Sequence, residues 1–518
     1  MPQYLSPGVY VEEVDSGSRP IEGVGTAVAA FVGIAASGPL HEPTLVSNWT
    51  QFTNIFGEFV EGSYLAHSVY GYFMNGGGNA YIVRIGSEGR KGAAPGSAAQ
   101  AALGPGQPDK EPPYTVTALE PGPAGNDITV EITHPQQQEG QDEPPADQFN
   151  IIVRRGGNLE ETFEGVTTRR GKANAATVVR DQSKLIRLEA TSGSIERPAA
   201  GSINLSGGNV PALPDRISPD EYVGDVADRT GLGALETIED VTMVSVPDLS
   251  AAYDRGAIDA EQFKAVQLAM ISHCELMGDR MAILDPPPNL TPQQIKEWRV
   301  ESAGYDSKFA TLYWPRIKVL DPVSGQGVFI PPSGHMSGIW ARNDDERGVH
   351  KAPANEVVRG AISLECTITR NEHDTLNPEG INCLRAFPGR GVRVWGARTL
   401  SSDPAWRYVN VRRLFNYLEK SILNNTDWVV FEPNDRNLWA KVRRTIASFL
   451  VMEWRKGALF GSTPAEAFFV KCDDETNPAE AIDLGQITCQ IGVAPVKPAE
   501  FVIFQLAQLQ GGVSLVSE

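Results

Sequence analysis

The chain has 518 residues, of which 41% are hydrophobic and 21% are charged, and its formal net charge is −19. This length exceeds one compact core and predicts about three globular domains. The acidic excess argues against a general nucleic-acid-binding protein, because contact with a phosphate backbone requires basic surface. No run reaches the roughly 18 apolar residues of a membrane span, and the N-terminus lacks a signal-peptide pattern, so we expect the chain to begin in the cytoplasm.

The first predicted element is an extended strand within residues 1–22, where SPGVYVEEV opens with a turn signal and continues in β-favouring residues. Too little sequence follows for a local partner, so this strand must pair with a distant segment of this chain or of another. A first α/β piece follows, with a strand over 27–35, a helix from a Ser47 cap to Gly57, a helix over 63–78 and a strand over 79–85.

The next stretch of the sequence changes character. Residues 86–112 are rich in Gly, Ala and Pro, which is typical of a linker, and short strands are predicted over 113–190. We interpret residues 89–234 as a small β-rich domain inserted into a larger α/β core.

The core resumes near residue 235 with three strands, over 241–248, 280–288 and 308–322, separated by helices. The helix over 258–278 is expected to bury Phe263, Val266, Met270 and Leu276, and a second helix has Thr291 as its cap and Pro292 at its first position. Strands that alternate with helices of this length predict a layered α/β fold with a parallel sheet.

The last third alternates again. We predict strands over 389–400 and 406–411, a helix over 411–422, a longer helix from Asp435 to Gly457, and a final strand over 500–509. The five cysteines of the chain form no CxxC pair, so we expect buried, reduced thiols rather than a zinc ribbon or a disulfide framework.

Catalytic motifs give little support to an enzyme. HExxH and GxxxxGK[ST] are absent, and GHMSG at 334–338 misplaces the serine of a nucleophile elbow. Asp248 and Asp285 follow predicted strands, where α/β enzymes often bind ligands, but acids in that position also cap turns. An α/β hydrolase or nucleotide enzyme is therefore the less favoured alternative, and only fold analogy supports it.

The segment PSGHMSGIWARNDDERGVHKAPAN, residues 332–355, collects residue types that serve in metal sites and acid–base catalysis. His335 and His350 are separated by a stretch rich in glycines and charges. We interpret the segment as a long, ordered polar loop held by side-chain-to-backbone hydrogen bonds.

Basic residues concentrate late in the chain. Residues 381–460 contain 14 Lys and Arg against 6 Asp and Glu, a local charge of +8. This is either a solvated basic helix face or a docking face for an acidic partner.

Several long segments resemble contractile tail sheath proteins of phage tails and phage-tail-like injection systems. They are residues 332–355 and 381–422, the start at 4–35, the end at 498–508 and, in the inserted domain, GPAGNDITVEI at 122–132. The matching core positions are Gly334, His335, Arg342, Arg347, Gly348, Lys351, Pro353, Asn355, Gly391, Trp395, Gly396 and Arg398.

The resemblance implies a structural subunit rather than an enzyme, with no cofactor and no metal. Such subunits form stacked six-fold rings around an inner tube and contract to drive that tube into a target envelope. The implied partners are copies of the chain itself, the inner tube protein, and the baseplate and terminator proteins, with no nucleic acid and no membrane insertion. The particle would assemble in the cytoplasm of the producing bacterium, and a phage virion tail and a bacterial injection system both remain open.

The resemblance also implies how the chain divides: an N-terminal strand-exchange arm (1–22), a first core segment (23–88), the inserted domain (89–234), a second core segment (235–380), a C-terminal core domain facing neighbours and tube (381–500) and a C-terminal arm (501–518). Strand exchange would use Val9, Tyr10, Val11, Phe501, Val502, Ile503 and Phe504. Basic helix residues would dock on the inner tube, and the candidates are Arg412, Arg413, Lys441, Arg443 and Arg444.

Overall fold

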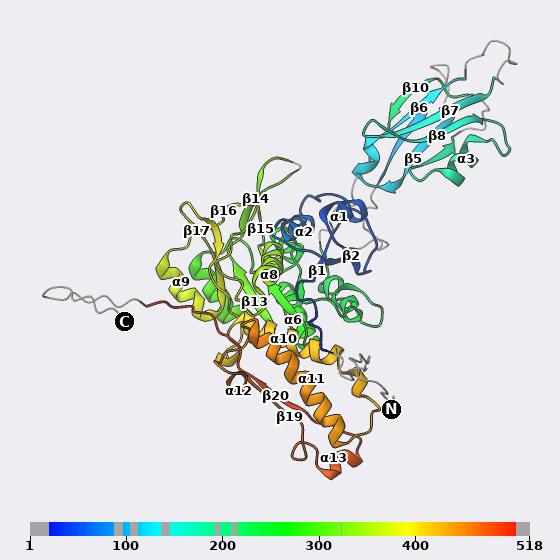
Figure 1. Ribbon diagram of the computed structural model, residues 1–518. Helices are drawn as coiled ribbons and strands as arrows, with labels where there is room; N and C mark the ends of the chain where they lie inside the picture. Colours follow the sequence, from blue (N-terminus) through cyan, green and yellow to red (C-terminus); the bar gives the residue numbers. More distant parts are fainter. Residues whose placement is uncertain are drawn as a thin grey trace, which may run out of the picture.

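The computed structural model (Figure 1) describes residues 20–86, 97–103, 112–135, 146–191, 197–208, 213, 216–322 and 324–503. They form a central α/β core, a β-rich inserted domain and a helical C-terminal module. None of the described helices is long and apolar enough to cross a membrane.

The core is built on an eight-stranded sheet in the order β18-β17-β13-β12-β11-β1-β3-β2. The strands from β17 through β3 run parallel, and β18 and β2 close the two edges in antiparallel orientation. Their bounds are β1 Ala29–Gly33, β2 Thr44–Val46, β3 Ala80–Arg84, β11 Met243–Ser245, β12 Met281–Leu284, β13 Ala310–Trp314, β17 Ile381–Phe387 and β18 Gly391–Val394. The predicted layered α/β fold with a parallel sheet is confirmed.

Both faces of this sheet are buried. In β12, Met281 and Ile283 join one hydrophobic cluster, whereas Ala282 and Leu284 join the other, because successive side chains of a strand point to opposite faces. One face is covered by α1 (Trp49–Phe56), α2 (Leu65–Met74) and α8 (Ser333–Arg347). The other face is covered by α4 (Pro219–Val223), α5 (Asp248–Asp254), α6 (Ala260–Met277), α7 (Pro292–Glu297) and α9 (Arg370–Leu376).

A smaller three-stranded sheet adjoins this core, in the order β15-β14-β16. It consists of β14 (Ile317–Leu320), β15 (Gly327–Ile330) and β16 (Ala361–Leu364). The single strand predicted over 308–322 is therefore two strands in two sheets, and the chain changes direction around Pro315, which cannot donate a ladder hydrogen bond.

The inserted domain packs two antiparallel sheets around a hydrophobic cluster of its own. One sheet holds β4 (Ala98–Leu103), β5 (Tyr114–Pro121) and β9 (Ile186–Ala190); the other holds β6 (Ile128–Thr133), β7 (Gln148–Arg155), β8 (Asn158–Thr167) and β10 (Gly201–Asn204), and α3 (Ala175–Gln182) lies beside them. Ile217, Tyr222 and Leu232 belong instead to the core cluster, so the boundary predicted at 234 lies inside the core.

The C-terminal module (residues 409–493) has a separate hydrophobic cluster. It contains α10 (Val409–Asn424), α11 (Arg436–Arg455), α12 (Pro464–Ala467), β19 (Phe468–Lys471), α13 (Ala479–Asp483) and β20 (Gln490–Val493). Because β17 and β18 complete the main sheet, the domain boundary predicted at 381 also lies inside the core.

Local capping follows the sequence closely in most helices. The Thr291 cap with Pro292, and the Asp435 cap of α11, are confirmed by side chains that accept from Gln294 N and Leu438 N. The cap of α1 is Asn48 rather than Ser47.

Three local predictions are wrong. Leu276 is 73% exposed although Phe263, Val266 and Met270 are buried as expected, because at 3.6 residues per turn Leu276 lies on the opposite face of α6. The strand predicted over 406–411 is replaced by the start of α10 at Val409, and β17 was not predicted as a strand.

Candidate functional site

The segment that first suggested chemistry is mostly a buried helix. Residues 333–347 form α8, so the loop predicted over 332–355 is wrong for its first two thirds. The polar loop was predicted because α8 has no one-sided apolar stripe: it packs against both the sheet and α2, and residues 333–343 are all buried. Gly334 permits this close approach, since an added Cβ would overlap the backbone of Ser68 on α2.

His335 sits at this helix–helix contact. Its side chain is almost fully buried, and burial lowers the pKa of its imidazole to about 3. The ring is therefore neutral at physiological pH, and an added Cβ at Gly71 of α2 would overlap it. Within the part of the chain that the structure describes, no group of three His, Cys, Asp or Glu residues is placed to hold a metal ion.

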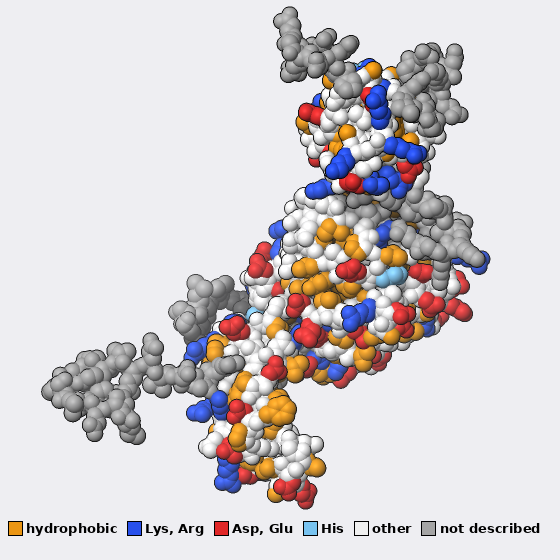
Figure 2. Space-filling model, turned by 90° about the vertical axis from the view of Figure 1, so that its right-hand side faces the viewer, with side chains coloured by type: hydrophobic (Ala, Val, Ile, Leu, Met, Phe, Trp, Pro, Cys, Tyr) orange, Lys and Arg blue, Asp and Glu red, His pale blue; other side chains and the backbone are white. Residues whose placement is uncertain are grey.

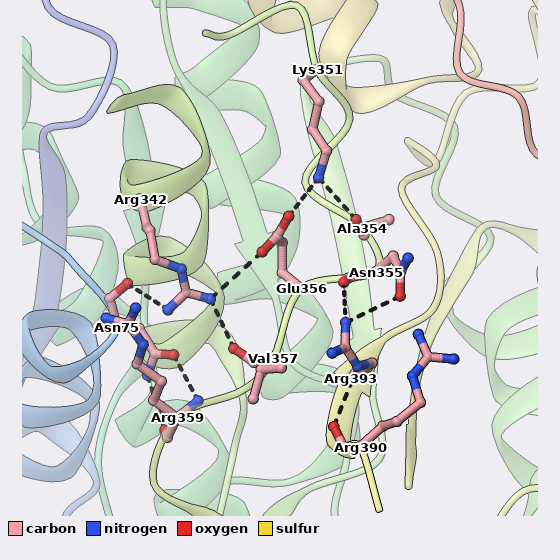
Figure 3. A network of polar contacts seen from close by, with 10 residues as sticks. All are labelled: Asn75, Arg342, Lys351, Ala354, Asn355, Glu356, Val357, Arg359, Arg390 and Arg393. Atoms are coloured by element: carbon pink, nitrogen blue, oxygen red, sulfur yellow. Dashed lines mark hydrogen bonds and ion pairs between the residues drawn. The ribbon is translucent and has the colours of Figure 1, made fainter. Parts of the chain in front are cut away.

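Arg342 connects α8 to its surroundings through backbone carbonyls (Figure 3). Its guanidinium donates to Asn75 O (3.0 Å) at the end of α2 and to Val357 O (2.8 Å) in the loop after α8. The Asn75 side chain completes this network of hydrogen bonds, because it donates to Arg359 O (3.1 Å) and accepts from Arg359 N (2.9 Å). Asn75, which the sequence did not single out, therefore holds three segments together.

The loop after α8 is fixed at its other side as well. Lys351 donates to Glu356 (2.6 Å) and to Ala354 O (3.0 Å), and Arg393 of β18 donates to Asn355 O (2.7 Å), as Figure 3 shows. Here the predicted ordered loop, held by side-chain-to-backbone bonds, is what the structure contains.

The remaining signature positions shape turns and contacts. Gly348 and Gly391 have φ values of 89° and 73°, which only glycine adopts readily. Gly396 packs against Asn382, and Trp395 packs on Phe387 at 4.7 Å between ring centroids. Pro353 is buried, whereas Arg347 is exposed.

A buried ion pair joins α8 to α10. Arg413 donates to both carboxylate oxygens of Asp344, at 2.8 and 2.5 Å, and stacks 4.6 Å above the Trp340 ring. Thr26, at the entry of the chain into the core, donates to the same carboxylate (2.6 Å). The acidic run of the sequence thus supplies a structural partner for an arginine 69 residues away.

Two of the five predicted tube-docking residues are corrected by this burial. Arg412 is 2% exposed and Arg413 is 4% exposed, so neither offers its charge at the surface. Arg412 donates to Asn416 (2.7 Å) and stacks on Trp406 at 4.5 Å. Of the other three, Arg443 and Arg444 are exposed on α11, and Lys441 lies 4.3 Å above the Trp428 ring.

The root of the C-terminal arm is clamped. Glu500 accepts two hydrogen bonds from Arg398 (2.9 and 2.7 Å), one from Asn377 (2.7 Å) and one from Tyr408 (3.0 Å). Partial burial favours a higher pKa for this carboxyl, but the hydrogen bonds from Arg398 and Asn377 outweigh it, and the Glu500 pKa lies below its ordinary value. The next three residues, Phe501, Val502 and Ile503, are exposed and lie in no described strand.

The root of the N-terminal arm is anchored to α10. Ile21 is buried in the cluster of the C-terminal module, Val24 N donates to Ser421 (3.1 Å), and Asn425 donates to Glu22 O (3.1 Å). Gly23 passes so close to Tyr417 that an added Cβ would overlap its hydroxyl. Val9, Tyr10, Val11 and Phe504 lie outside the described residues.

The C-terminal module carries a small sheet with free edges. Of the strands that the structure describes, β19 pairs with β20 alone, so each strand leaves backbone groups on its outer side. Large apolar side chains nearby are exposed, including Phe460 and Phe469. Figure 2 shows hydrophobic side chains at the surface of this narrow lower part of the molecule.

Comparison with known proteins places this geometry in a family. The model of the phage tail sheath protein central domain matches residues 227–400, and that of the phage tail sheath C-terminal domain matches residues 401–508. Together these ranges cover more than half of the chain.

Curated relatives are tail sheath proteins. The tail sheath protein of Vibrio phage KVP40 is 24% identical over 388 residues, which cover 69% of this chain and 54% of the relative. The alignment with the tail sheath protein of Salmonella phage ViI covers 58% of that relative. The chain therefore spans little more than half the length of these two relatives. The tail sheath protein of Burkholderia phage BcepMu is 22% identical over 540 residues, and this alignment covers 98% of each of the two chains.

Solved structures share the fold. The sheath of an extracellular contractile injection system (PVC) in its contracted state aligns with a TM-score of 0.58 at 24% identity, over 98% of this chain and 99% of that one. The contracted helical sheath of the anti-feeding prophage aligns with the same TM-score at 23% identity, over 97% and 99%. The chain belongs to the phage tail sheath protein family.

Proposed function

We propose that the chain is the structural subunit of a contractile sheath, which polymerises as stacked six-fold rings around an inner tube and contracts to drive that tube into a target cell envelope. In this role it is not an enzyme and needs no cofactor, nucleic acid or membrane insertion. Copies of itself, the tube protein, and the baseplate and terminator proteins are its partners.

One observation carries this proposal: the roots of the two arms are fixed at the two ends of α10, in the module that also carries a sheet with free edges. Glu500 is held by Arg398 and Tyr408, the latter immediately before α10, and residues 21–24 lie against α10 itself. Anchored roots followed by arms suit strand exchange, in which backbone hydrogen bonds join neighbours while rings move. The β19–β20 sheet is the acceptor that we infer for a neighbour's strand.

The basic residues that remain exposed support a weak contact with an acidic tube. Arg443 and Arg444 on α11 present charge to solvent, and exposed ion pairs of this kind are individually weak, which suits a contact that must release on contraction. Arg412 and Arg413 are buried and bond to Asn416 and Asp344 inside the fold instead.

A phage virion tail is the alternative setting, and it shares fold and mechanism. The full-length relative from Burkholderia phage BcepMu and the two injection-system sheaths cover this chain almost equally. We favour the injection system, in which the particle forms in the cytoplasm and acts or is released from there. Capsid and terminase genes beside this gene would point to a phage, and toxin and AAA-ATPase genes to an injection system.

Negative-stain electron microscopy of the purified full chain tests the function. We expect striated hollow sleeves, and dispersed monomers with hydrolytic activity would overturn the proposal. Deletion of residues 1–20 retains Ile21 in its cluster, so the truncated chain should stay folded by circular dichroism yet form no sleeves. Normal contracting sleeves from this truncation would refute strand exchange.

A further inference from the structure

Two cysteines flank the small sheet of the C-terminal module. The β19–β20 ladder pairs Phe468 with Val493 and runs to the pair of Lys471 with Gln490. One further step along the same register places Cys472 opposite Cys489. The register therefore places the two thiols beside each other at the end of the sheet.

The alternation of hydrogen bonds along the β19–β20 ladder indicates that the Cα atoms of Cys472 and Cys489 lie close together. Ala494 N donates to Ala467 O (2.8 Å), which identifies the pair of 467 with 494 as hydrogen-bonded. Hydrogen-bonded and non-hydrogen-bonded pairs alternate in an antiparallel ladder, so Cys472 and Cys489 occupy a non-hydrogen-bonded pair. Such pairs have Cα atoms about 4.5 Å apart with side chains on one face, and disulfides span Cα separations of about 4.4–6.8 Å.

The intervening loop holds the two thiols in place. Asn477 accepts from Thr488 N (2.6 Å), donates to Thr488 O (3.1 Å) and lies 3.8 Å from Cys472 Sγ. This side chain ties the two ends of residues 473–488 together without any covalent link.

The two cysteines differ in access. Cys472 is 1% exposed and belongs to the hydrophobic cluster, whereas Cys489 is only partly buried. Burial raises the pKa of both thiols, to about 12 for Cys489, so at neutral pH only a small fraction of either is thiolate and exchange with an external disulfide is slow. Cys489 is the sulfur that a small external disulfide reaches first.

We propose that Cys472 and Cys489 form an oxidative modification site, which closes to a disulfide when the chain meets a low-molecular-weight disulfide outside a reducing compartment. The Cys489 thiolate attacks one sulfur of oxidised glutathione and releases one glutathione thiol. The Cys472 thiolate then attacks Cys489 Sγ and releases the second. The two protein thiols lose two electrons and two protons, and the glutathione disulfide gains them.

The bond would lock the end of the sheet that we propose as the strand acceptor, so this consequence rests on the proposed function. A particle that leaves the cell would then keep its acceptor sheets closed at one end after release, because disulfides persist in oxidising surroundings. The bond itself requires only the geometry of the single chain.

Thiol mapping by mass spectrometry of the full native chain tests the site. After incubation with oxidised glutathione, we expect a loss of about 2 Da and one linked peptide pair containing Cys472 and Cys489. Cys472→Ser should stop the reaction at a glutathione adduct on Cys489, and Cys366→Ser, a control at another partly buried cysteine, should leave the linked pair intact. The same reaction in urea should give mixed pairings.

A stable glutathione adduct on wild-type Cys489, a different pairing, or no reaction of the native chain would each overturn the proposal. The consequence is measured separately, by comparing oxidised and reduced sleeves for resistance to dilution. Equal resistance with the linked peptide present refutes the locking role, and absence of sleeves in both states refutes the proposed function instead.

Discussion

Arg413 of α10 and Asp344 of α8 face each other as a bidentate ion pair, with both side chains only 4% exposed. This pair joins the core to the C-terminal module, and the Thr26 hydroxyl donates a further hydrogen bond to the Asp344 carboxylate. A charge in this place is tolerated because its partner and its hydrogen bonds are present.

Asp344→Ala should therefore destabilise the chain by about 3–5 kcal/mol, because it leaves the buried Arg413 charge without a partner. Urea unfolding followed by tryptophan fluorescence measures the change. Asp345→Ala removes the neighbouring exposed acid and should cost less than about 0.5 kcal/mol. Equal effects of the two substitutions would contradict the assignment.

Gly71→Ala should destabilise the fold by about 1–3 kcal/mol through overpacking against the His335 ring. At an open helix position the same change would stabilise by about 1 kcal/mol, so the sign is diagnostic. In the double variant with His335→Ala the overlap is gone, and thermal unfolding should show that the Gly71→Ala penalty disappears. A penalty that persists in the double variant would place its cause elsewhere.

Glu500→Gln should weaken the hold of Arg398 on the root of the C-terminal arm and reduce sleeve formation, with little change in the circular dichroism of the subunit. Glu480→Gln, at an exposed site on α13, is the matched control. Because the Glu500 pKa is depressed in the fold, its stabilising effect is present above the unfolded value near 4.5 and is lost as pH falls through the folded value. Sleeve counts by electron microscopy that match the wild type would refute the clamp.

Arg443→Glu with Arg444→Glu should reduce co-assembly with the tube protein, as judged by co-sedimentation, and the effect should be largest at low salt. Arg180→Glu with Lys184→Glu makes the same charge change on exposed residues of the inserted domain. If both double variants bind the tube equally well, the docking face lies elsewhere.

Asp285 predicts a pH effect of the opposite sign to that of Glu500. It follows β12, accepts from Ser333 N (3.1 Å), and burial raises its pKa to about 7. The stability that its protonated form contributes is complete below about pH 4 and is lost as pH rises through about 7. Asp285→Asn should therefore gain stability relative to the wild type between pH 4 and 7, by at most about 4 kcal/mol. The exposed Asp240→Asn should show no such trend in urea unfolding at several pH values.

Sequence patterns predicted the layered core because its strands alternate with helices of ordinary length and carry clear caps, as at Thr291 and Asp435. They failed at α8, whose small residues pack tightly against α2 and leave no one-sided apolar stripe. They failed again at 406–411, where Tyr and Val favour a strand, whereas the structure begins α10 at Val409.

The candidate site was only partly predictable, because its bonds join residues far apart in the sequence. Arg398 was recognised, but nothing local identifies Glu500, 102 residues later, as its partner. Likewise, the basic character of 412–413 gave no sign that Trp406, Trp340 and Asp344 enclose these guanidinium groups. Charge counting finds where basic residues lie in the sequence, whereas burial decides which of them face solvent.

The anchoring of both ends beside α10 has a mechanical consequence. A pull on the N-terminal arm enters the fold at α10, which Arg413 and Asp344 join to the core, whereas a pull on the C-terminal arm reaches the core directly, through the bonds of Glu500 to Arg398 and Asn377. The inserted domain branches off after β3, outside this line of tension (Figure 1). In the proposed sheath, force transmitted between rings would therefore not pass through the inserted domain. The size and chemistry of its outer surface could then vary without weakening the connection between subunits.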